Sequence, residues 1–344
     1  MSEAGQGLAM GVVGVGSHGF HHARILREIP GVEMVGVHDV RPERAREVAE
    51  ELSVPRHETL TGLLDAVEAL VVAVPTAQHE EVAQEAMARG VHVFIEKPIA
   101  PDLATADRIV EAANRHGVTL QVGHVERFNA AVREAEPYLD RPLFIECHRL
   151  APFTPRGIDV AVVLDLMIHD VDLIRSLVGR PVENMDATGV PVLTPTVDIA
   201  NARLTFADGA VANLTASRVS AEKMRKLRIF QRSGYLSLDL AKGEGQYLRL
   251  KGELPGFQNA GAGGNGEATL VEQMAKGGLA DIVERIPIRG DGAEPLRREL
   301  ESFRESVTGG TAPLVSGDDA RAALGVALEI EERINRHVAH TRPS

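Results

Sequence analysis

The feature that most constrains this chain is the alternation of short apolar runs with helical patterns over its first 123 residues. Continuous apolar runs of this length are typical of strands buried on both faces. Strands that alternate with helices form βαβ units, which build a parallel sheet covered by helices. The expected strands are Leu8–Val13, Val32–Val37, Ala69–Val74, Val91–Ile95 and Thr119–Val122, and the expected helices are Phe20–Glu28, Pro42–Leu52, Gln78–Arg89 and a helix capped by Asp102 that ends at His116.

The pattern changes after Gly123, where β-rich runs follow one another and are joined by turn signals such as Asp208-Gly209. This part predicts a mainly antiparallel sheet with helices on one face. We therefore expect two domains, a doubly wound dinucleotide-binding domain at 1–123 and an α+β domain at 124–344. The Gly-rich segment Pro255–Gly266 is expected to be a mobile loop or an insertion at the domain edge. The expected strands are Phe144–Leu150, Ala200–Phe206, Ala210–Ser217, Lys226–Gln231 and Tyr235–Leu240, and the expected helices are Val160–Val178, Pro295–Thr308 and Asp318–His337.

Composition excludes several classes of function. The chain has 344 residues, enough for two domains, and a net charge of −12, which argues against nucleic acid and anionic membranes as partners. One cysteine, Cys147, allows no internal disulfide and fits a reducing compartment. The first twenty residues hold no Lys or Arg, and no apolar run is long enough to span a bilayer, so we expect a cytoplasmic protein.

The segment Gly14-Val15-Gly16-Ser17-His18-Gly19 is a G-x-G-x-x-G motif placed between an expected strand and an expected helix. In that context the glycines allow a tight turn, close approach of a pyrophosphate and close helix–strand packing. Asp39 follows the second strand, 20 residues beyond the motif, where a carboxylate binds the ribose hydroxyls and repels a 2′-phosphate. NAD is therefore favoured over NADP, although Arg41 could hold a 2′-phosphate.

The same turn carries three histidines, His18, His21 and His22, which could be metal ligands. No cysteine or carboxylate accompanies them locally, and they lie where the phosphates of a dinucleotide would bind. We therefore expect histidines beside a cofactor and no metal.

Two further segments predict chemistry. Lys97, in Glu96-Lys97-Pro98, follows the fourth strand and so lies at the sheet edge where ligands bind, although a lysine there can also be a solvated surface charge. On a helix, Asp165, His169 and Asp172 would share one face. Such a cluster can be an acid–base pair, a structural ion-pair cluster or a metal site.

The chain resembles the Gfo/Idh/MocA oxidoreductases in Gly14–Gly19 with His22, Val74-Pro75-Thr76 with His79, Glu96-Lys97-Pro98, and the Asp165, His169, Asp172 spacing. The resemblance implies an N-terminal Rossmann domain and a C-terminal open-faced sheet that is used for assembly into a homodimer or homotetramer. It implies catalytic roles for Lys97, Asp165 and His169. It also implies cofactor contacts from Val74, Pro75, Thr76, His79, Glu96 and Lys97.

Gly123–Asn129 and Val163–Asp170 are similar to the branch of that family comprising the UDP-N-acetylglucosamine 3-dehydrogenases, except that Ala130 stands where most members have Pro. The branch makes a 3-keto nucleotide sugar for transamination, as in lipid A synthesis. The diphosphate of such a substrate needs cations, for which Arg127, Arg149 and Arg156 are candidates, whereas Lys223, Arg225, Lys226 and Arg228 are expected on a solvated strand face. The expected substrate-binding residues are Glu126, Arg127, Phe128, Asn129, Arg149, Arg156, Asp165 and His169.

The expected mechanism has His169, oriented by Asp165, accept the proton of the C3 hydroxyl while Lys97 binds the same oxygen. Lys97 and His169 could exchange these roles. Three alternatives stay open: a dehydrogenase for another sugar or cyclitol (UDP-GlcNAc uronic acid, inositol or a free aldose), a non-catalytic NAD-binding sensor, and a metal-dependent enzyme.

Overall fold

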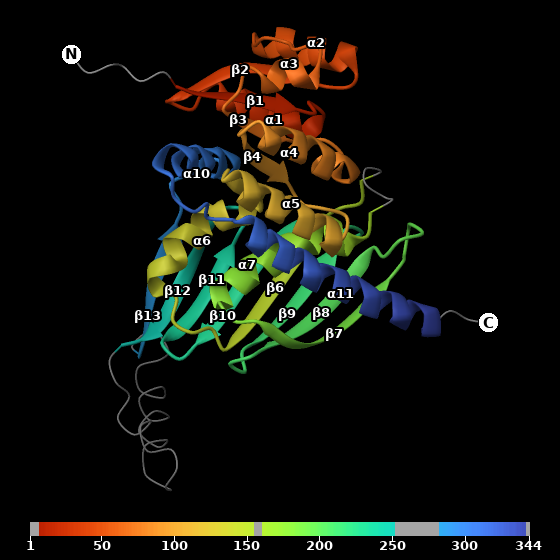
Figure 1. Cartoon of the computed structure of the whole chain (residues 1–344). Helices are drawn as coiled ribbons and strands as arrows, with labels where there is room; N and C mark the ends of the chain where they lie inside the picture. Colours follow the sequence, from red (N-terminus) through yellow and green to blue (C-terminus); the bar gives the residue numbers. More distant parts are fainter. Residues whose placement is uncertain (1–6, 155–159, 252–281, 342–344) are drawn as a thin grey trace, which may run out of the picture.

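The computed structural model describes residues 7–154, 160–251 and 282–341, which form two sheets with helices between and around them (Figure 1). Arg156 and the segment Pro255–Gly266 lie outside the described residues. Within those ranges, no helix combines the length and the apolar character that are needed to cross a bilayer.

The first sheet has five parallel strands in the order β2-β1-β3-β4-β5. Its central strand β3 is completely buried, as expected from an apolar run covered on both faces. The strands are β1 (Leu8–Val13), β2 (Val32–His38), β3 (Ala69–Val72), β4 (His92–Glu96) and β5 (Leu120–Gly123). The helices of this part are α1 (Ser17–Leu26), α2 (Pro42–Leu52), α3 (Leu60–Leu64), α4 (His79–Ala88) and α5 (Leu103–His116).

The second sheet has eight strands in the order β13-β12-β11-β10-β6-β9-β8-β7. All neighbours in it are antiparallel except β6 and β9, which run parallel. The strands are β6 (Phe144–Leu150), β7 (Val182–Val190), β8 (Ile199–Phe206), β9 (Val211–Ser217), β10 (Met224–Gln231), β11 (Gly234–Asp239), β12 (Glu244–Leu250) and β13 (Val283–Arg289).

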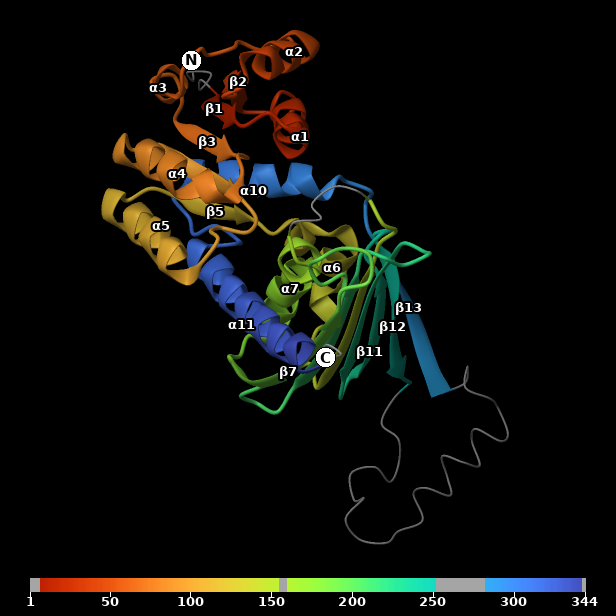
Figure 2. The ribbon, with the colours of Figure 1, turned by 90° about the vertical axis from the view of Figure 1, so that its right-hand side faces the viewer.

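The described helices of the second part lie on one side of this sheet (Figure 2). They are α6 (Ala130–Ala135), α7 (Ile168–Val178) and α11 (Gly317–Thr341), with the short turns η2 (Val125–Phe128) and η4 (Val163–Met167). Along most strands, buried side chains facing the helices alternate with more exposed ones on the open face.

The C-terminal helices link the two parts. Helix α10 (Pro295–Gly309) packs against α1, and its Phe303 contacts Phe94 of β4 edge to face, so residues far along the chain complete the core of the first sheet. Helix α11 runs from α5 to β7 across the second part. The predicted boundary at residue 123 coincides with the end of β5, yet residues 295–309 return to the first sheet.

The structure confirms the predicted fold class and adds elements that the sequence patterns did not indicate. Helix α3, helix α6 and strands β7, β12 and β13 were not predicted. The helix expected at Val160–Val178 begins instead with a π-helical turn, η4, followed by α7. This turn changes which side chains share a face and therefore affects the site described next.

Candidate active site

A cavity of about 770 Å³ lies at the carboxyl ends of β1, β2 and β3. It is lined by eight of the residues predicted to bind a cofactor, which come from the Gly-rich turn, the end of β2 and the loop after β3. These are Gly14, Gly16, Ser17, His18, Asp39, Arg41, Val74 and Pro75.

The three glycines of the turn have distinct structural roles. Gly14 has a φ of +81°, which side chains rarely allow, and a Cβ at Gly19 would overlap the carbonyl oxygen of Gly14. A Cβ at Gly16, by contrast, would meet no atom within 4 Å, because this residue faces open space in the cavity. Helix α1 begins at Ser17 with no side-chain cap, so its first N–H groups are available to phosphate oxygens. Val15 is buried behind the turn.

Asp39 is held at the edge of this cavity by two backbone contacts. The N–H of Val15 donates to Oδ2 at 2.9 Å and the N–H of Arg41 donates to Oδ1 at 2.9 Å. The guanidinium of Arg41 also contacts the carboxylate, with Nε 3.2 Å from Oδ1. Burial alone would raise the pKa of Asp39, but these hydrogen bonds outweigh burial and lower the pKa below its usual range. The carboxylate is therefore ionised at neutral pH at the edge of the first cavity.

His79 lies behind the cavity and not on its wall. Its ring is buried, with Nε2 3.0 Å from the carbonyl oxygen of Val74 and Nδ1 3.1 Å from that of Pro98. The histidine thus joins the loop after β3 to the loop after β4. Thr76 lies in the turn η1 (Thr76–Gln78), next to the lining residue Pro75.

A second cavity, of about 340 Å³, brings Lys97 and His169 together. His18 lines both cavities, so the Gly-rich turn separates the two spaces. The other described lining residues are His21, His22, Glu96, Gly123, Val125, Glu294, Leu296 and Glu299. The two residues expected to carry the chemistry therefore face one space beside the cofactor cavity.

Lys97 contacts Asp165, and this arrangement corrects the predicted pairing of Asp165 with His169. Nζ of Lys97 donates to the main-chain oxygen of Asp165 at 2.6 Å and lies 3.5 Å from its carboxylate. Among the described residues no hydrogen bond joins Asp165 to His169. The physical reason is η4, because i→i+5 bonding in a π turn rotates Asp165 away from the residue four positions later.

His169 is held in its neutral form by its surroundings. Burial lowers its pKa well below the usual value, and the charges of Lys97 and Arg149 lower it further. The ring of His124 packs edge to face on that of His169, with centroids 6.2 Å apart. Nδ1 of His169 and both ring nitrogens of His124 are buried without a hydrogen-bond partner in the described part of the chain. A neutral imidazole at this position can accept a proton.

Glu96 contacts His22 in the lining of the same cavity. Its Oε1 lies 2.6 Å from Nε2 of His22. Burial alone would raise the pKa of Glu96, but the hydrogen bond with His22 and the nearby charges of His18 and Lys97 lower it to about 2. Glu96 is thus an anion next to Lys97, and its Oε2 accepts the N–H of that lysine at 3.1 Å.

Arg149 is buried in the second part and is not available to a ligand. It contacts both oxygens of Asp170, with Nη2 2.6 Å from Oδ1, and its Nη1 donates to Oε1 of Glu126 at 2.8 Å. All three side chains are at most 4% exposed. Arg149 and Glu126, predicted as substrate contacts, instead anchor helix α7 to β6 and η2.

Arg127 has a similar structural role towards the next acidic residue of α7, Asp172. Nε and Nη2 of Arg127 donate to the two oxygens of Asp172 at 2.8 and 3.0 Å. The acidic neighbours of His169 on α7, Asp170 and Asp172, are thus both paired with arginines. The carboxylate of Asp172 is buried and bonded to Arg127, so for this residue the structural ion-pair alternative holds.

The remaining predicted substrate contacts, Phe128 and Asn129, are also buried. Oδ1 of Asn129 accepts the N–H of Ala131 and caps α6, while its Nδ2 donates to the main-chain oxygen of Leu240 at 2.8 Å. These residues build the support of the site and do not line its cavities.

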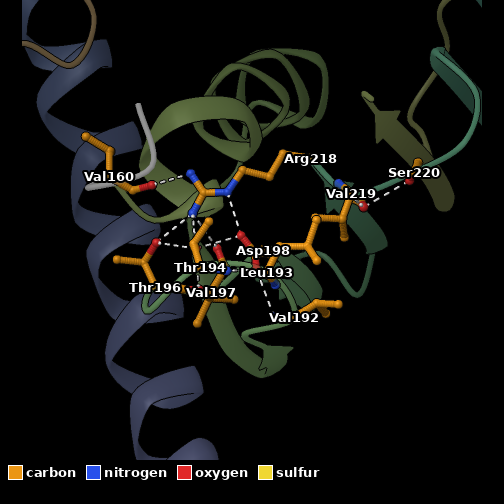
Figure 3. A network of polar contacts seen from close by, with 11 residues as sticks. Val160, Val192, Leu193, Thr194, Thr196, Val197, Asp198, Arg218, Val219 and Ser220 are labelled. Carbon is orange, nitrogen blue, oxygen red and sulfur yellow. Dashed lines mark hydrogen bonds and ion pairs between the residues drawn. The ribbon is translucent and has the colours of Figure 1, made fainter. Parts of the chain in front are cut away.

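A separate polar network holds the chain that enters η4 (Figure 3). Nη1 of Arg218 donates to the carbonyl oxygen of Val160 at 2.7 Å, and its Nε donates to Asp198 at 2.9 Å. Oδ2 of Asp198 in turn accepts three successive backbone N–H groups, from Val192, Leu193 and Thr194. The loop before β8 and the segment before η4 are therefore fixed to each other.

Comparison with known proteins shows the family. Residues 8–124 match the model described as "Oxidoreductase family, NAD-binding Rossmann fold", and residues 121–237 match the GFO/IDH/MocA C-terminal domain. A UDP-N-acetylglucosamine 3-dehydrogenase of Acidithiobacillus ferrooxidans is 35% identical over 322 residues, which cover 93% of this chain and 95% of that protein. The chain belongs to the Gfo/Idh/MocA oxidoreductase family.

A solved structure and a second sequence relative agree with this membership. A structure of the A. ferrooxidans enzyme superposes with a TM-score of 0.84 at 32% identity and covers 96% of this chain and 98% of that one. A scyllo-inositol 2-dehydrogenase (NAD(+)) of Bacillus subtilis is 26% identical over 341 residues, covering 92% of this chain and 91% of that protein. This Gfo/Idh/MocA chain is thus an NAD-dependent dehydrogenase, and the open space at Gly16 with the carboxylate of Asp39 fits its cofactor.

Several lining residues of this Gfo/Idh/MocA site were not predicted from the sequence, and two missed residues, His124 and Glu299, bear on its electrostatics. His124 directly follows β5, so the rule that ligand-binding side chains follow parallel strands could have indicated it. Glu299 of α10 is buried in the wall of the second cavity, and burial together with the charges of Glu96 and Asp172 raises its pKa well above the usual value. No local signal marks Glu299, because its neighbours come from distant segments.

Among the described residues no group of three or more His, Cys, Asp or Glu side chains could hold a metal ion.

Proposed function

We propose that this protein oxidises the C3 hydroxyl of UDP-N-acetylglucosamine with NAD, giving the 3-keto nucleotide sugar. The observation that carries the proposal is the cavity in which Lys97 and neutral His169 meet beside the cofactor cavity. The relative named for this activity is 35% identical over 93% of the chain, whereas the scyllo-inositol dehydrogenase is 26% identical over 92%, and this higher identity supports the nucleotide sugar over the cyclitols.

The proposed chemistry assigns each step to a group of this chain. NAD, when bound, supplies the acceptor for the hydride that leaves C3. His169 accepts the hydroxyl proton, because a neutral imidazole has one unprotonated ring nitrogen whose lone pair can take it. Lys97 donates a hydrogen bond to the same oxygen and stabilises the negative charge that develops there. Asp165 orients Lys97 through its main-chain oxygen and carboxylate.

The cofactor contacts are proposed for the residues that line the first cavity. The Gly14–Gly19 turn would hold the pyrophosphate, Asp39 the adenosine ribose, and Val74 and Pro75 the wall beside the nicotinamide end. We assign residues 1–123 to cofactor binding and 124–344 to substrate binding and assembly, with α10 as the exception that returns to the first sheet.

The test is NADH absorbance with purified protein, NAD and each of UDP-GlcNAc, UDP-GlcNAc uronic acid, free GlcNAc and inositol. A 3-aminotransferase with glutamate removes the keto product and pulls an unfavourable equilibrium. We expect NADH with UDP-GlcNAc and no signal from Lys97→Ala under the same conditions. NADH with inositol or free GlcNAc alone would refute the nucleotide-sugar assignment. Silence across the panel despite NAD binding would favour a sensor.

A homo-oligomer is proposed through the open face of the second sheet. Phe144, Phe230 and Tyr235 form a ring cluster there, with centroids 5.6 and 4.6 Å apart, and Phe230 is 37% exposed. A second copy would remove this apolar surface from water. Sedimentation should show Phe230→Glu as a smaller species. Leu314→Glu, at a residue equally exposed on another surface, should sediment like the wild type.

The cellular setting of the proposal is the cytoplasm, where a lone buried cysteine stays reduced. There the 3-keto product would be transaminated to a 3-amino sugar for a lipid A type pathway. The aminotransferase-coupled assay tests whether the product is the 3-keto sugar, since only a 3-keto product yields a 3-amino sugar in that assay.

A further inference from the structure

We propose that Arg225, at the start of β10, binds the diphosphate of the substrate. The inference rests on the proposed function and adds a binding residue to it. The cations predicted for this task are unsuitable or outside the described residues. Arg149 is buried in its ion pair with Asp170, and the guanidinium of Arg127 is already paired with both oxygens of Asp172.

The direction of Arg225 follows from its position on the strand. Leu227 and Ile229 of β10 are buried under the helices, and side chains two residues apart share one face. Arg225 therefore points to the helix side, whereas Lys226 and Arg228 point to the open face, where they pair with Asp239 and Glu146. Lys226 and Arg228 thus share the open face, whereas Arg225, with a similarly exposed side chain, lies on the helix side.

Arg225 is placed next to the catalytic helix by its strand neighbour. It is the cross-strand partner of Arg149, which bonds Asp170, the residue after His169. The charge of Arg225 also contributes to the lowered pKa of His169. The sugar of a bound nucleotide sugar must reach His169, so its diphosphate lies nearby on the same side of the sheet. A cation such as Arg225 on that side can bind the diphosphate.

The guanidinium of Arg225 is available for such a contact. Within the described residues its hydrogen bonding consists of one long contact, from Nη1 to Oε1 of Glu126 at 3.4 Å. That oxygen already accepts a shorter bond from Arg149, so Glu126 keeps a charged partner if Arg225 turns to a ligand. The side chain of Arg225 is 39% exposed, and four of its five N–H donors are left for phosphate oxygens.

The experiment compares Arg225→Gln with Arg228→Gln, a matched control on the same strand. Both residues are half-exposed, and both contact one glutamate at 3.3–3.4 Å, but they face opposite sides of the sheet. The probes are UDP and uridine, titrated by calorimetry, followed by initial rates with UDP-GlcNAc and NAD. Uridine lacks the diphosphate, so it reports any general damage to the pocket.

We expect Arg225→Gln to weaken UDP binding and raise the KM for UDP-GlcNAc about ten- to hundredfold, as expected for the loss of a charge-assisted contact, with uridine binding and the KM for NAD unchanged. Arg228→Gln should behave as the wild type. Equal weakening of UDP and uridine, or no change in either, would overturn the proposal for Arg225.

Arg225→Lys, which keeps the charge, should recover part of the UDP affinity. This variant distinguishes a lost phosphate contact from a loss of folding in Arg225→Gln. If the wild type itself neither binds UDP nor turns over UDP-GlcNAc, the proposed function fails, and the role of Arg225 fails with it. Turnover by the wild type with an unchanged Arg225→Gln variant would refute only the role of Arg225.

Discussion

Replacing Arg149 by Met tests whether the buried ion pairs of the second part support the catalytic helix. The substitution preserves much of the side-chain volume but leaves Asp170 and Glu126 buried without their principal cation. Removing one partner of a buried pair destabilises a protein by about 3–5 kcal/mol. Glu126 retains Asn129 and Arg225 as partners, so most of the loss should come from Asp170.

The assay is thermal and urea unfolding of Arg149→Met beside Arg228→Met. At about 2 °C per kcal/mol for a unit of this size, the first variant should unfold roughly 6–10 °C below the wild type. Arg228 makes a half-exposed pair with Glu146, and such pairs contribute about 0–1 kcal/mol, so the control should shift little. Because α7 carries His169, kcat should also fall in Arg149→Met.

The pH dependence of the stability difference between Arg149→Met and the wild type separates the loss of ion pairs from the loss of packing. In Arg149→Met the carboxylate of Asp170 is a buried group without its cation, so its neutral, protonated form fits the folded state better than its charged form. Such a group favours the folded state at low pH and disfavours it as the pH rises, so the stability deficit should narrow as the pH is lowered from 7.5 towards 5. A deficit that stays constant with pH, or one below 1 kcal/mol, would refute the ion-pair explanation.

Three further predictions address the cavities and the buried histidines. Lys97→Ala should abolish NADH formation but leave NADH binding, followed by fluorescence, within about twofold; normal turnover would exclude its catalytic role. Asp39→Ala should lower the NAD/NADP preference in kcat/KM by about tenfold or more, because a carboxylate that repels the 2′-phosphate is removed while Arg41 stays. Burial lowers the pKa values of His79, His124 and His169, so below about pH 6.5 the unfolded chain takes up protons that the folded chain does not. As the pH is lowered below this value, the free energy of unfolding should therefore fall, by up to about 1.4 kcal/mol per pH unit for each of these histidines. Urea titrations at pH 7.5, 6.5 and 5.5 would measure this fall.

Sequence patterns predicted the fold well where one local signal determines an element. The apolar runs of the first sheet and the caps of α5, Asp102 at its start and Gly117 at its end, correspond closely to the structure. Strands β12 and β13 were missed because their sequences mix charged, Gly and Pro residues with few apolar ones, and β13 is an edge strand. Pairing with a neighbouring strand, which no local pattern reports, specifies them.

The site was predictable to the extent that strand ends determine it. Lys97 and Asp39 each follow a parallel strand, and the topology alone brings such residues to one edge. The partners of Arg127 and Arg149 were not predictable, because a charged residue beside a motif looks the same in sequence whether it binds a ligand or a buried carboxylate. Only the long-range contacts of Arg149 with Asp170, 21 residues away, show which of these it does.

The pairing of Asp165 with Lys97 separates two functions that the helical spacing had combined. A regular helix would have placed the carboxylate beside His169, where it would raise the affinity of the imidazole for a proton. The π turn directs Asp165 to the lysine instead, and the charges of Lys97, Arg149 and Arg225 lower the pKa of His169. The imidazole is thus kept neutral, with one ring nitrogen free to accept a proton, while Asp165 holds the lysine. On this reasoning Asp165→Asn should reduce kcat through Lys97 and leave the acidic limb of the pH–rate profile, set by His169, unshifted. A shift of that limb by half a pH unit or more would show that Asp165 acts on His169 after all.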